Sequence, residues 1–163
     1  MLDVSPMSDT STPPPLAVAF GADHTGVALK DVLAAALRDQ GFDVRDLGTT
    51  GADRVDYPDF AYKVAAVVAD GTAQLGVLVC GTGIGMAIAA NRHPAIRCAV
   101  VHDVTSARLS RAHNNANVLA LGARLIGETV ALDCLLAFLG TGFEGGRHAS
   151  RVAKLSPAGR PTA

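Results

Sequence analysis

The chain has 163 residues, of which 49% are hydrophobic, and it carries a net charge of -1 at pH 7. This length and apolar content are typical of one compact domain with a buried core. The 14 basic and 15 acidic residues are interspersed, whereas a nucleic-acid-binding face clusters Lys and Arg, so we expect no nucleic-acid partner. The apolar stretches are well under the roughly 20 residues that span a bilayer, so we expect no membrane partner either.

The two ends of the chain differ in composition from the middle. Residues 1–15 lack the charged and apolar segments of a secretory signal, and their Ser, Thr and Pro content favours extended, unpacked chain. Residues 158–163 read in the same way. We therefore predict a disordered leader at 1–15, a single domain at 16–157 and a flexible tail at 158–163.

The three cysteines, Cys80, Cys98 and Cys134, are an odd number without metal-ligand spacing. This pattern argues against a disulfide framework and against a structural zinc site. A reducing cytoplasm is therefore the expected location of the protein.

Strand and helix patterns alternate along the chain. Residues 16–20 form a continuously apolar run, which is typical of a strand covered on both faces. The period then changes, because Leu29, Leu33 and Leu37 share one helical face. Lys30 is expected to lie off that face.

The remaining elements are predicted by the same patterns. Strands are expected at 16–20, 42–46, 74–80, 96–101 and 118–121. Helices are expected from 29 to a stop at Gly41, from a cap at Asp59 to 69, over 85–91, from a cap at Asp103 to 111, and over 128–139. Five strand-then-helix units of this length predict an α/β fold, a three-layer αβα sandwich around a five-stranded parallel, Rossmann-like sheet.

Polar residues follow the predicted strands, at the edge where open parallel sheets bind their ligands. They are Asp23, His24, Asp46, Thr49, Cys80, Thr82, His102 and Asp103, with His113, Asn114 and Asn115 just past the next predicted helix. A lone histidine is more often a satisfied structural residue than a catalyst. Several polar loops that meet at one edge favour a ligand site there.

The third strand runs into the glycine-rich turn from Cys80 to Gly85. Alternate glycines let the backbone turn sharply, so that successive N–H groups converge on one negative oxygen. A cysteine beside a helix N-terminus has its thiolate favoured, which makes Cys80 a candidate base or nucleophile. The alternative is a buried structural cysteine at an ordinary glycine turn.

A second group of candidate residues lies near the C-terminus. Arg147 and Arg151 are four residues apart, on one helical face beside His148, and Gly145-Gly146 permits a sharp entry to that helix. This arrangement is suited to binding a phosphate group with charge-assisted hydrogen bonds. The alternative is a solvated basic helix end.

Five motifs in order carry a resemblance to a known family. They are GADHTG at 21–26, DYPD at 56–59, LVCGTGIGMAIAAN at 78–91, SARLSRAHNNANVLALGAR at 106–124 and FEGGRHASRV at 143–152. Together, from about Leu16 to Leu155, they resemble the type B ribose-5-phosphate isomerases, whose wider family includes galactose-6-phosphate and allose-6-phosphate isomerases. The resemblance implies interconversion of ribose 5-phosphate and ribulose 5-phosphate through an enediolate, without metal or organic cofactor.

The resemblance also implies residue roles. The position of Cys80 belongs to the base that moves a proton between C2 and C1, and that of His113 to the residue that assists ring opening. The implied anion hole comprises Thr82 and the backbone N–H groups of Gly81, Gly83, Ile84 and Gly85. The implied sugar contacts are Asp23, Asp46, Tyr57 and Asn114, and the implied phosphate contacts are His24, Arg124, Arg147, His148 and Arg151. A homodimer with active sites built from both subunits is expected, with a tetramer as the alternative.

Two other functions remain open at this stage. Cys80 with His102 or His113 and an aspartate could form the catalytic set of a cysteine hydrolase or acyltransferase. The same pocket could instead serve a catalytically silent sugar-phosphate sensor. The motifs also leave open the choice between pentose and hexose phosphates, which depends on pocket depth, and the division of roles between His102 and His113.

Overall fold

A computed structural model describes residues 14–156 of the chain, so most of the predicted leader and the tail at 158–163 lie outside the described residues. The strands are β1 (Ala17–Ala22), β2 (Asp43–Asp46), β3 (Leu75–Cys80), β4 (Cys98–Val100) and β5 (Val118–Gly122). The helices are α1 (Val27–Asp39), α2 (Tyr57–Ala69), α3 (Ile84–Ala90), α4 (Val104–Asn114), α5 (Glu128–Leu139) and α6 (Arg147–Ala153).

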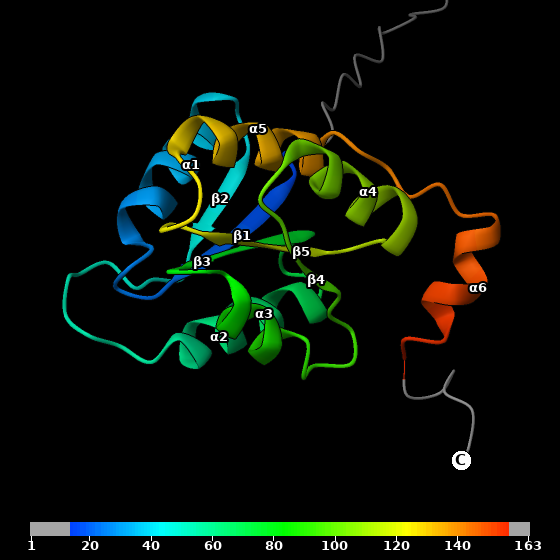
Figure 1. Cartoon of the computed structure of the whole chain (residues 1–163), viewed down its shortest axis with the longest axis horizontal. Coiled ribbons are helices and arrows are strands. Elements are labelled where there is room, and N and C mark those ends of the chain that lie inside the picture. The colour runs from blue at the N-terminus through cyan, green and yellow to red at the C-terminus, as the bar shows by residue number, and fades with distance from the viewer. Residues whose placement is uncertain (1–13, 157–163) are drawn as a thin grey trace, which may run out of the picture.

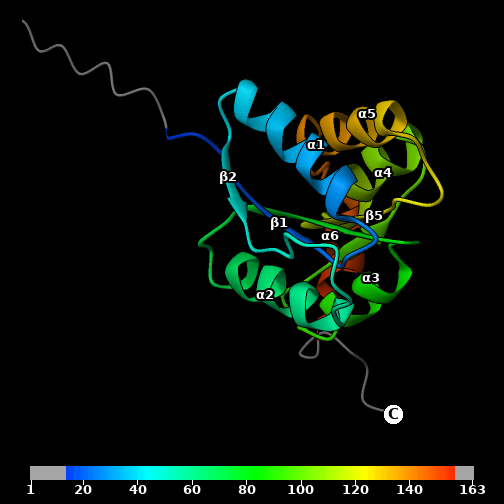
Figure 2. The same cartoon turned by 90° about the vertical axis from the view of Figure 1, so that its left-hand side faces the viewer.

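The five strands form one sheet in the order β2-β1-β3-β5-β4, and every neighbouring pair is parallel. Helices α1, α4 and α5 cover one face and α2 and α3 cover the other (Figures 1 and 2). Helix α6 lies outside this sandwich, beside α4. The predicted three-layer α/β fold with a single domain is therefore confirmed.

The centre of the sheet is buried because both faces of its central strands are apolar. Val18 and Phe20 of β1 pack toward α1 and α5, whereas Ala19 of the same strand packs toward α2. All six residues of β1 and all six of β3 are buried. This continuous apolar pattern is typical of central parallel strands and explains why the sheet formed as predicted.

Several helix boundaries differ from the prediction by one to three residues, and two of these differences concern α2 and α4, which carry candidate site residues. Helix α2 begins at Tyr57, so Asp59 lies in its first turn and is not its cap; Pro58, with its preset φ, occupies the first turn instead. Helix α4 continues to Asn114 and ends at Asn115, which has a left-handed φ of 47°. His113 and Asn114 are therefore held in the last turn of α4 and do not lie in a loop beyond it.

Other local predictions are confirmed. The Asp103 side chain caps α4 by accepting a hydrogen bond of 2.8 Å from the Ser106 backbone N–H. Arg147 and Arg151 lie one turn apart on α6, which Gly145 and Gly146 enter with positive φ angles. Within residues 14–156, every helix is too short or too polar to cross a bilayer.

Candidate active site

The end of β3 is the point where the loops after three strands meet. Backbone hydrogen bonds tie them together: Asp23 N donates to Val79 O at 3.2 Å and Ala123 N donates to Cys80 O at 2.8 Å. Arg124 N also donates to Gly81 O, at 3.0 Å. Because β3 is flanked by β1 and β5, the carboxyl edge of the sheet brings these segments around Cys80.

The Cys80 thiol is buried and is in contact with the glycine turn. Its Sγ accepts a hydrogen bond of 3.1 Å from Gly83 N, and the Thr82 hydroxyl accepts one of 3.3 Å from Ile84 N. Gly83 has a φ of +78°, and a Cβ there would lie 3.0 Å from the backbone of Leu121. Glycine is therefore required at the position that aims its N–H at the sulfur.

Side chains from other segments of the chain lie over this turn. A Cβ placed on Gly85 would come within 2.7 Å of the Tyr57 ring, so this ring packs directly on the backbone there. A Cβ on Gly81 would lie 3.4 Å from Arg124 Cδ and 3.5 Å from Thr25 Oγ1. The structure thus gathers Tyr57 and Arg124 beside the Cys80 turn.

The loop after β1 is held by its own polar side chains. Asp23 is buried, and its Oδ1 accepts hydrogen bonds from Thr25 N at 2.9 Å and from Thr25 Oγ1 at 2.6 Å. His24 Nδ1 accepts a hydrogen bond of 3.4 Å from Val55 N. A ring nitrogen that accepts carries no proton, so His24 presents its other nitrogen as a donor.

The Asp46 side chain forms an ion pair with a buried lysine. Its Oδ2 pairs with Lys30 Nζ, and its Oδ1 accepts a hydrogen bond of 2.9 Å from Gly48 N. Gly48 O in turn accepts a hydrogen bond of 2.7 Å from Ala22 N, next to Asp23. Asp46 therefore links the interior of the fold to the loop at the candidate site.

Lys30 is the residue that the sequence pattern placed wrongly. It is fully buried, not on the outer face of α1. The missed signal is that Lys30, Ala34 and Leu37 recur at the spacing of one helical stripe, and all three are buried. A buried ammonium needs a paired carboxylate. Lys30 Nζ accordingly donates hydrogen bonds to one carboxylate oxygen of Asp31 and to one of Asp46.

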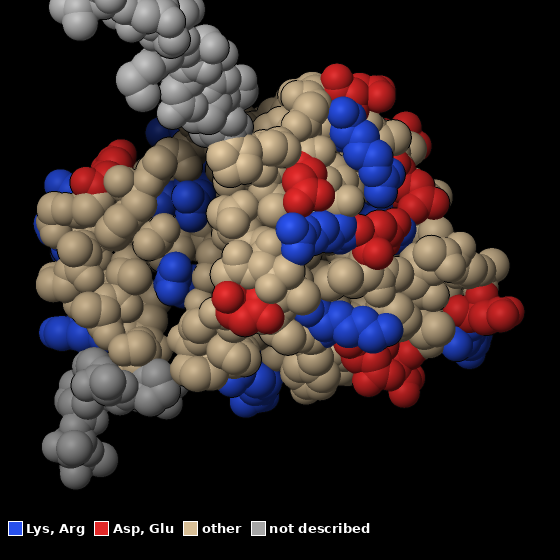
Figure 3. All heavy atoms as spheres, turned by 180° about the vertical axis from the view of Figure 1, so that it is seen from behind, with Lys and Arg blue, Asp and Glu red and all other residues tan. Residues whose placement is uncertain are grey.

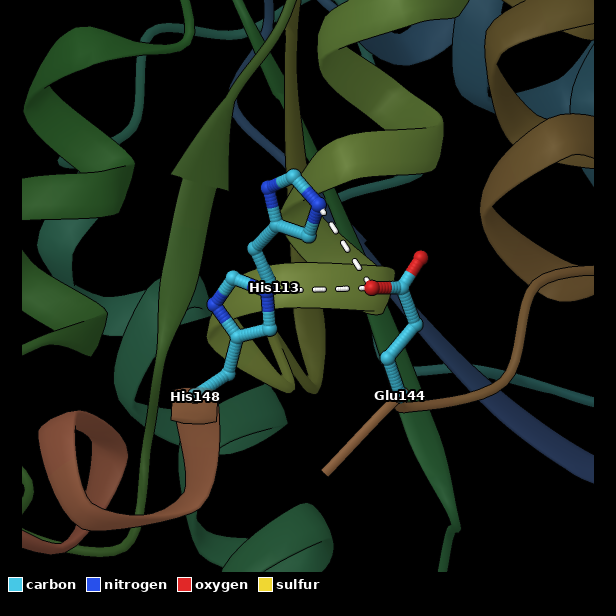
Figure 4. A group of neighbouring side chains, drawn as sticks. All are labelled: His113, Glu144 and His148. Carbon is cyan, nitrogen blue, oxygen red and sulfur yellow. Dashed lines mark ion pairs between the residues drawn. The ribbon is translucent and has the colours of Figure 1, made fainter. Parts of the chain in front are cut away.

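A second group of predicted residues lies where α6 meets α4. The rings of His113 and His148 are stacked with centroids 4.3 Å apart and planes 11° apart. Glu144 Oε2 lies 3.8 Å from His113 Nε2 and 3.7 Å from His148 Nε2 (Figure 4). Glu144 is itself tethered to α4, because its backbone N–H donates to Ala112 O at 3.0 Å.

The donor atoms of this histidine–glutamate cluster all lie within 4.8 Å of one another, a spacing that calls for a test of metal binding. The lone pair of each Nε2 lies in the plane of its ring. Since the two planes are nearly parallel, the lone pairs do not converge on one ion. The arrangement therefore does not fit a metal centre.

A cavity of about 300 Å³ opens beside the cluster. It is lined by His113, Asn114, His148, Arg151, Val152 and Leu155. Arg147 lies in the first turn of α6, the helix that also carries His148 and Arg151, and is exposed. The cavity thus gathers His148 and Arg151, which were predicted to contact phosphate, Asn114, which was predicted to contact the sugar, and His113, which was predicted to assist ring opening.

His148 has a pKa below the ordinary value of 6.5. Burial is the main cause, followed by the neighbouring charges of His113 and Arg147. Its Nε2 is buried and has no hydrogen-bond partner among residues 14–156. The folded chain thus disfavours the protonated imidazole.

This lowered pKa predicts a pH-dependent loss of stability. Below about pH 6.5 the unfolded chain binds the His148 proton more readily than the folded chain, so stability is retained above that pH and falls as the pH decreases. We expect the urea midpoint to fall less between pH 7.5 and 5.5 in His148→Gln than in the wild type. The exposed His93→Gln is the matched control, and equal pH dependence in all three proteins would contradict the assignment.

The two groups of predicted residues lie at opposite ends of the sheet. Figure 1 shows α6 on the side away from the turn between β3 and α3. Among the described residues, the hydrogen-bond partner of Cys80 Sγ is Gly83 N and not a histidine. A nucleophile–base pair of the hydrolase type needs such a bond, so the geometry of one chain does not favour that alternative.

His102, the other candidate histidine, follows β4. Its Nε2 is buried and has no hydrogen-bond partner within residues 14–156. His102 does not line the cavity at α6, whereas His113 does. His113 is therefore the candidate histidine that lies with the α6 group.

Comparison with known proteins gives a consistent result. The family model described as Ribose/Galactose Isomerase matches residues 18–155. Ribose-5-phosphate isomerase B of Escherichia coli strain K12 is 46% identical over 139 residues, which cover 85% of this chain and 93% of that protein.

Two solved structures are similar over nearly all of their length. Ribose-5-phosphate isomerase B of Clostridium thermocellum is 48% identical with a TM-score of 0.85, covering 86% of this chain and 95% of that one. The Mycoplasma genitalium enzyme, crystallised with bound ribulose-5-phosphate, is 38% identical with a TM-score of 0.86, covering 90% and 98%. This chain therefore belongs to the ribose/galactose isomerase family, together with the type B ribose-5-phosphate isomerases.

Proposed function

We propose that this isomerase interconverts ribose 5-phosphate and ribulose 5-phosphate, with Cys80 as the base. The observation that carries the proposal is the buried Cys80 thiol, held by Gly83 N–H inside a turn that Tyr57 and Arg124 cover. The names of the relatives and the ribulose-5-phosphate bound to one of them support the choice of substrate.

The proposed reaction is a proton transfer between neighbouring carbons. The Cys80 thiolate takes the proton from C2 of the open-chain aldose, and the electron pair moves onto the C1 carbonyl oxygen to give an enediolate. The thiol returns the proton to C1, and the proton of the C2 hydroxyl ends on O1, so C2 becomes the ketone. Atoms and electrons balance without a redox partner.

The glycine turn supplies the donors for the enediolate. Gly83 N donates a hydrogen bond to Cys80 Sγ, and Ile84 N, the next residue of the turn, donates one to Thr82 Oγ1. Fixed donors near developing charge stabilise it strongly, and loss of one donor typically costs about 10²–10³ in rate. We propose that substrate oxygen takes up the N–H groups of this turn, from Gly81 to Gly85.

The group at α6 supplies the complementary functions. We propose that His113 assists opening of the sugar ring and that Arg147, His148 and Arg151 bind the phosphate. A phosphate held away from the reacting carbons supplies binding energy and orients those carbons against the base.

Because the two groups lie at opposite ends of one chain, we propose a homodimer in which each site combines the Cys80 turn of one subunit with the α6 group of its partner. Exposed apolar side chains support an interface on α3. Ile84 and Ile88 are one helical turn apart and are 52% and 54% exposed. They line a groove of about 420 Å³ between α3 and the edge strand β4. Such a patch is typical of a protein contact.

The direct test is an NMR assay of the purified full chain with ribose 5-phosphate in the presence of EDTA. We expect ribulose 5-phosphate to accumulate to an equilibrium mixture, with and without the chelator. A hexose 6-phosphate assayed in parallel measures the depth of the pocket through the ratio of kcat/KM values. Tight binding of ribose 5-phosphate without any isomerisation would overturn the proposal in favour of a sensor.

A further inference from the structure

A second cavity opens at the amino-terminal edge of the sheet, opposite Cys80. Its volume is about 480 Å³, and the beginnings of β1, β3 and β5 contribute Leu16, Leu75 and Asn117 to its wall. The end of α5 closes it with the segment from Leu139 to Gly142. None of the residues proposed above for isomerisation lines this cavity.

Two half-buried arginines line the cavity and are fixed by backbone carbonyls. Arg97 Nε donates to Asn115 O at 2.7 Å. Arg111 Nε donates to Thr141 O at 3.3 Å, and its Nη1 donates to Ala116 O at 2.6 Å. Within residues 14–156, Arg97 Nη1 and Nη2 and Arg111 Nη2 make no hydrogen bond to protein, so positioned donors remain for a ligand.

Neither guanidinium has a carboxylate partner among the described residues. The ion pairs there involve Lys30, Arg45, His113 and His148 only. Burial lowers the pKa of Arg97, and burial followed by the nearby charge of Arg97 lowers that of Arg111. Two like charges that share one partly desolvated cavity are unfavourable until an anion lies between them.

The remaining lining suits a small organic molecule. Gln74 uses its Oε1 to accept a hydrogen bond from Ala17 N at 2.8 Å, so its amide nitrogen remains a donor. Leu16, Leu75 and Leu139 supply an apolar wall. Seen from behind, the molecule has a hollow in which Lys or Arg side chains lie (Figure 3). The cavity volume is within the usual range of small-molecule sites, roughly 300–1,000 Å³.

We propose that this arginine cavity binds a phosphate-bearing small molecule, with the phosphate between Arg97 and Arg111 and the organic part against the leucines. Arginine suits this role because its planar fork of N–H groups matches phosphate oxygens in pairs. The site is separate from the proposed active site and does not depend on the isomerase reaction.

The test is an NMR titration of the full chain with inorganic phosphate and, separately, with ribose 5-phosphate. To remove phosphate binding at α6, both titrations are repeated in an Arg147→Ala/Arg151→Ala background. We expect phosphate to shift the backbone amides of Gly140 and Gly142 in both proteins. Ribose 5-phosphate that shifts them at lower concentration than phosphate identifies a sugar phosphate as the ligand class, and the reverse order identifies free phosphate.

Arg97→Gln is expected to weaken phosphate binding at these amides by at least about tenfold, since one bidentate cation is lost. Its isomerase activity is expected to remain at the wild-type level. The exposed Arg38→Gln changes the net charge equally and should leave the affinity unchanged. The proposal fails if Arg97→Gln binds phosphate as tightly as Arg38→Gln. It also fails if phosphate, added to the wild type, shifts only amides of the Cys80 turn or of α6. This second criterion uses the wild-type protein alone, so it holds even if a variant does not fold.

Discussion

Replacement of Cys80 by alanine is expected to reduce kcat by at least about 10²–10⁴-fold, the usual contribution of a positioned general base. The dissociation constant for ribose 5-phosphate should change little, because the proposed phosphate contacts lie on other segments. The measurement is turnover followed by NMR, with ligand affinity from calorimetry on the same protein. A large effect on kcat without an effect on binding is the behaviour of a group that acts in the transition state.

The matched control for this variant is Cys98→Ala, which removes a thiol at the edge strand. Burial raises the pKa of the Cys98 thiol to about 12, so it is not expected to serve as a base near neutral pH. This control should keep near-wild-type turnover. Full activity of Cys80→Ala would remove Cys80 from the proposed mechanism, and Cys80→Ser provides a second test if the alanine variant folds poorly.

The fold was predictable because local and long-range signals agree. The apolar runs of β1 and β3 are each followed by a helical pattern. Strands that alternate with helices in this way favour a parallel sheet with right-handed connections over other fold classes. The boundaries were less predictable, since they depend on single residues such as Asn115, whose left-handed φ ends α4 later than the apolar pattern does. Helix ends are determined by such local conformations more than by periodicity.

The local backbone at Cys80 was predictable from the sequence, but the burial of Lys30 was not. The glycine spacing around Cys80 indicated a tight turn, and the structure contains one. The burial of Lys30 on α1 could not be inferred from its charge, because the buried ammonium is paired with Asp46 on strand β2. The alternation of strands and helices did not predict that the Cys80 turn and the α6 group lie at different ends of the sheet; only the resemblance to a family implied that the two groups come from different subunits.

That separation leads to a prediction about mixed dimers. Cys80→Ala and His113→Ala should each be nearly inactive, yet a mixture allowed to exchange subunits should recover up to about one quarter of wild-type activity. Half of the randomly formed dimers are mixed, and in each of them one site has an intact Cys80 facing an intact His113 of the partner, whereas the other site lacks both.

The measurement is the ribose 5-phosphate assay after co-refolding the two variants, with a Cys80→Ala and Cys80→Ser mixture as the matched control. The control should stay inactive, because no pairing of these subunits restores a thiol. Recovery is possible only if each site takes its base from one chain and its histidine from the other. Sites built within single chains would leave both mixtures equally inactive, and the proposed homodimer with shared sites would then be wrong even if Cys80 and His113 are each essential.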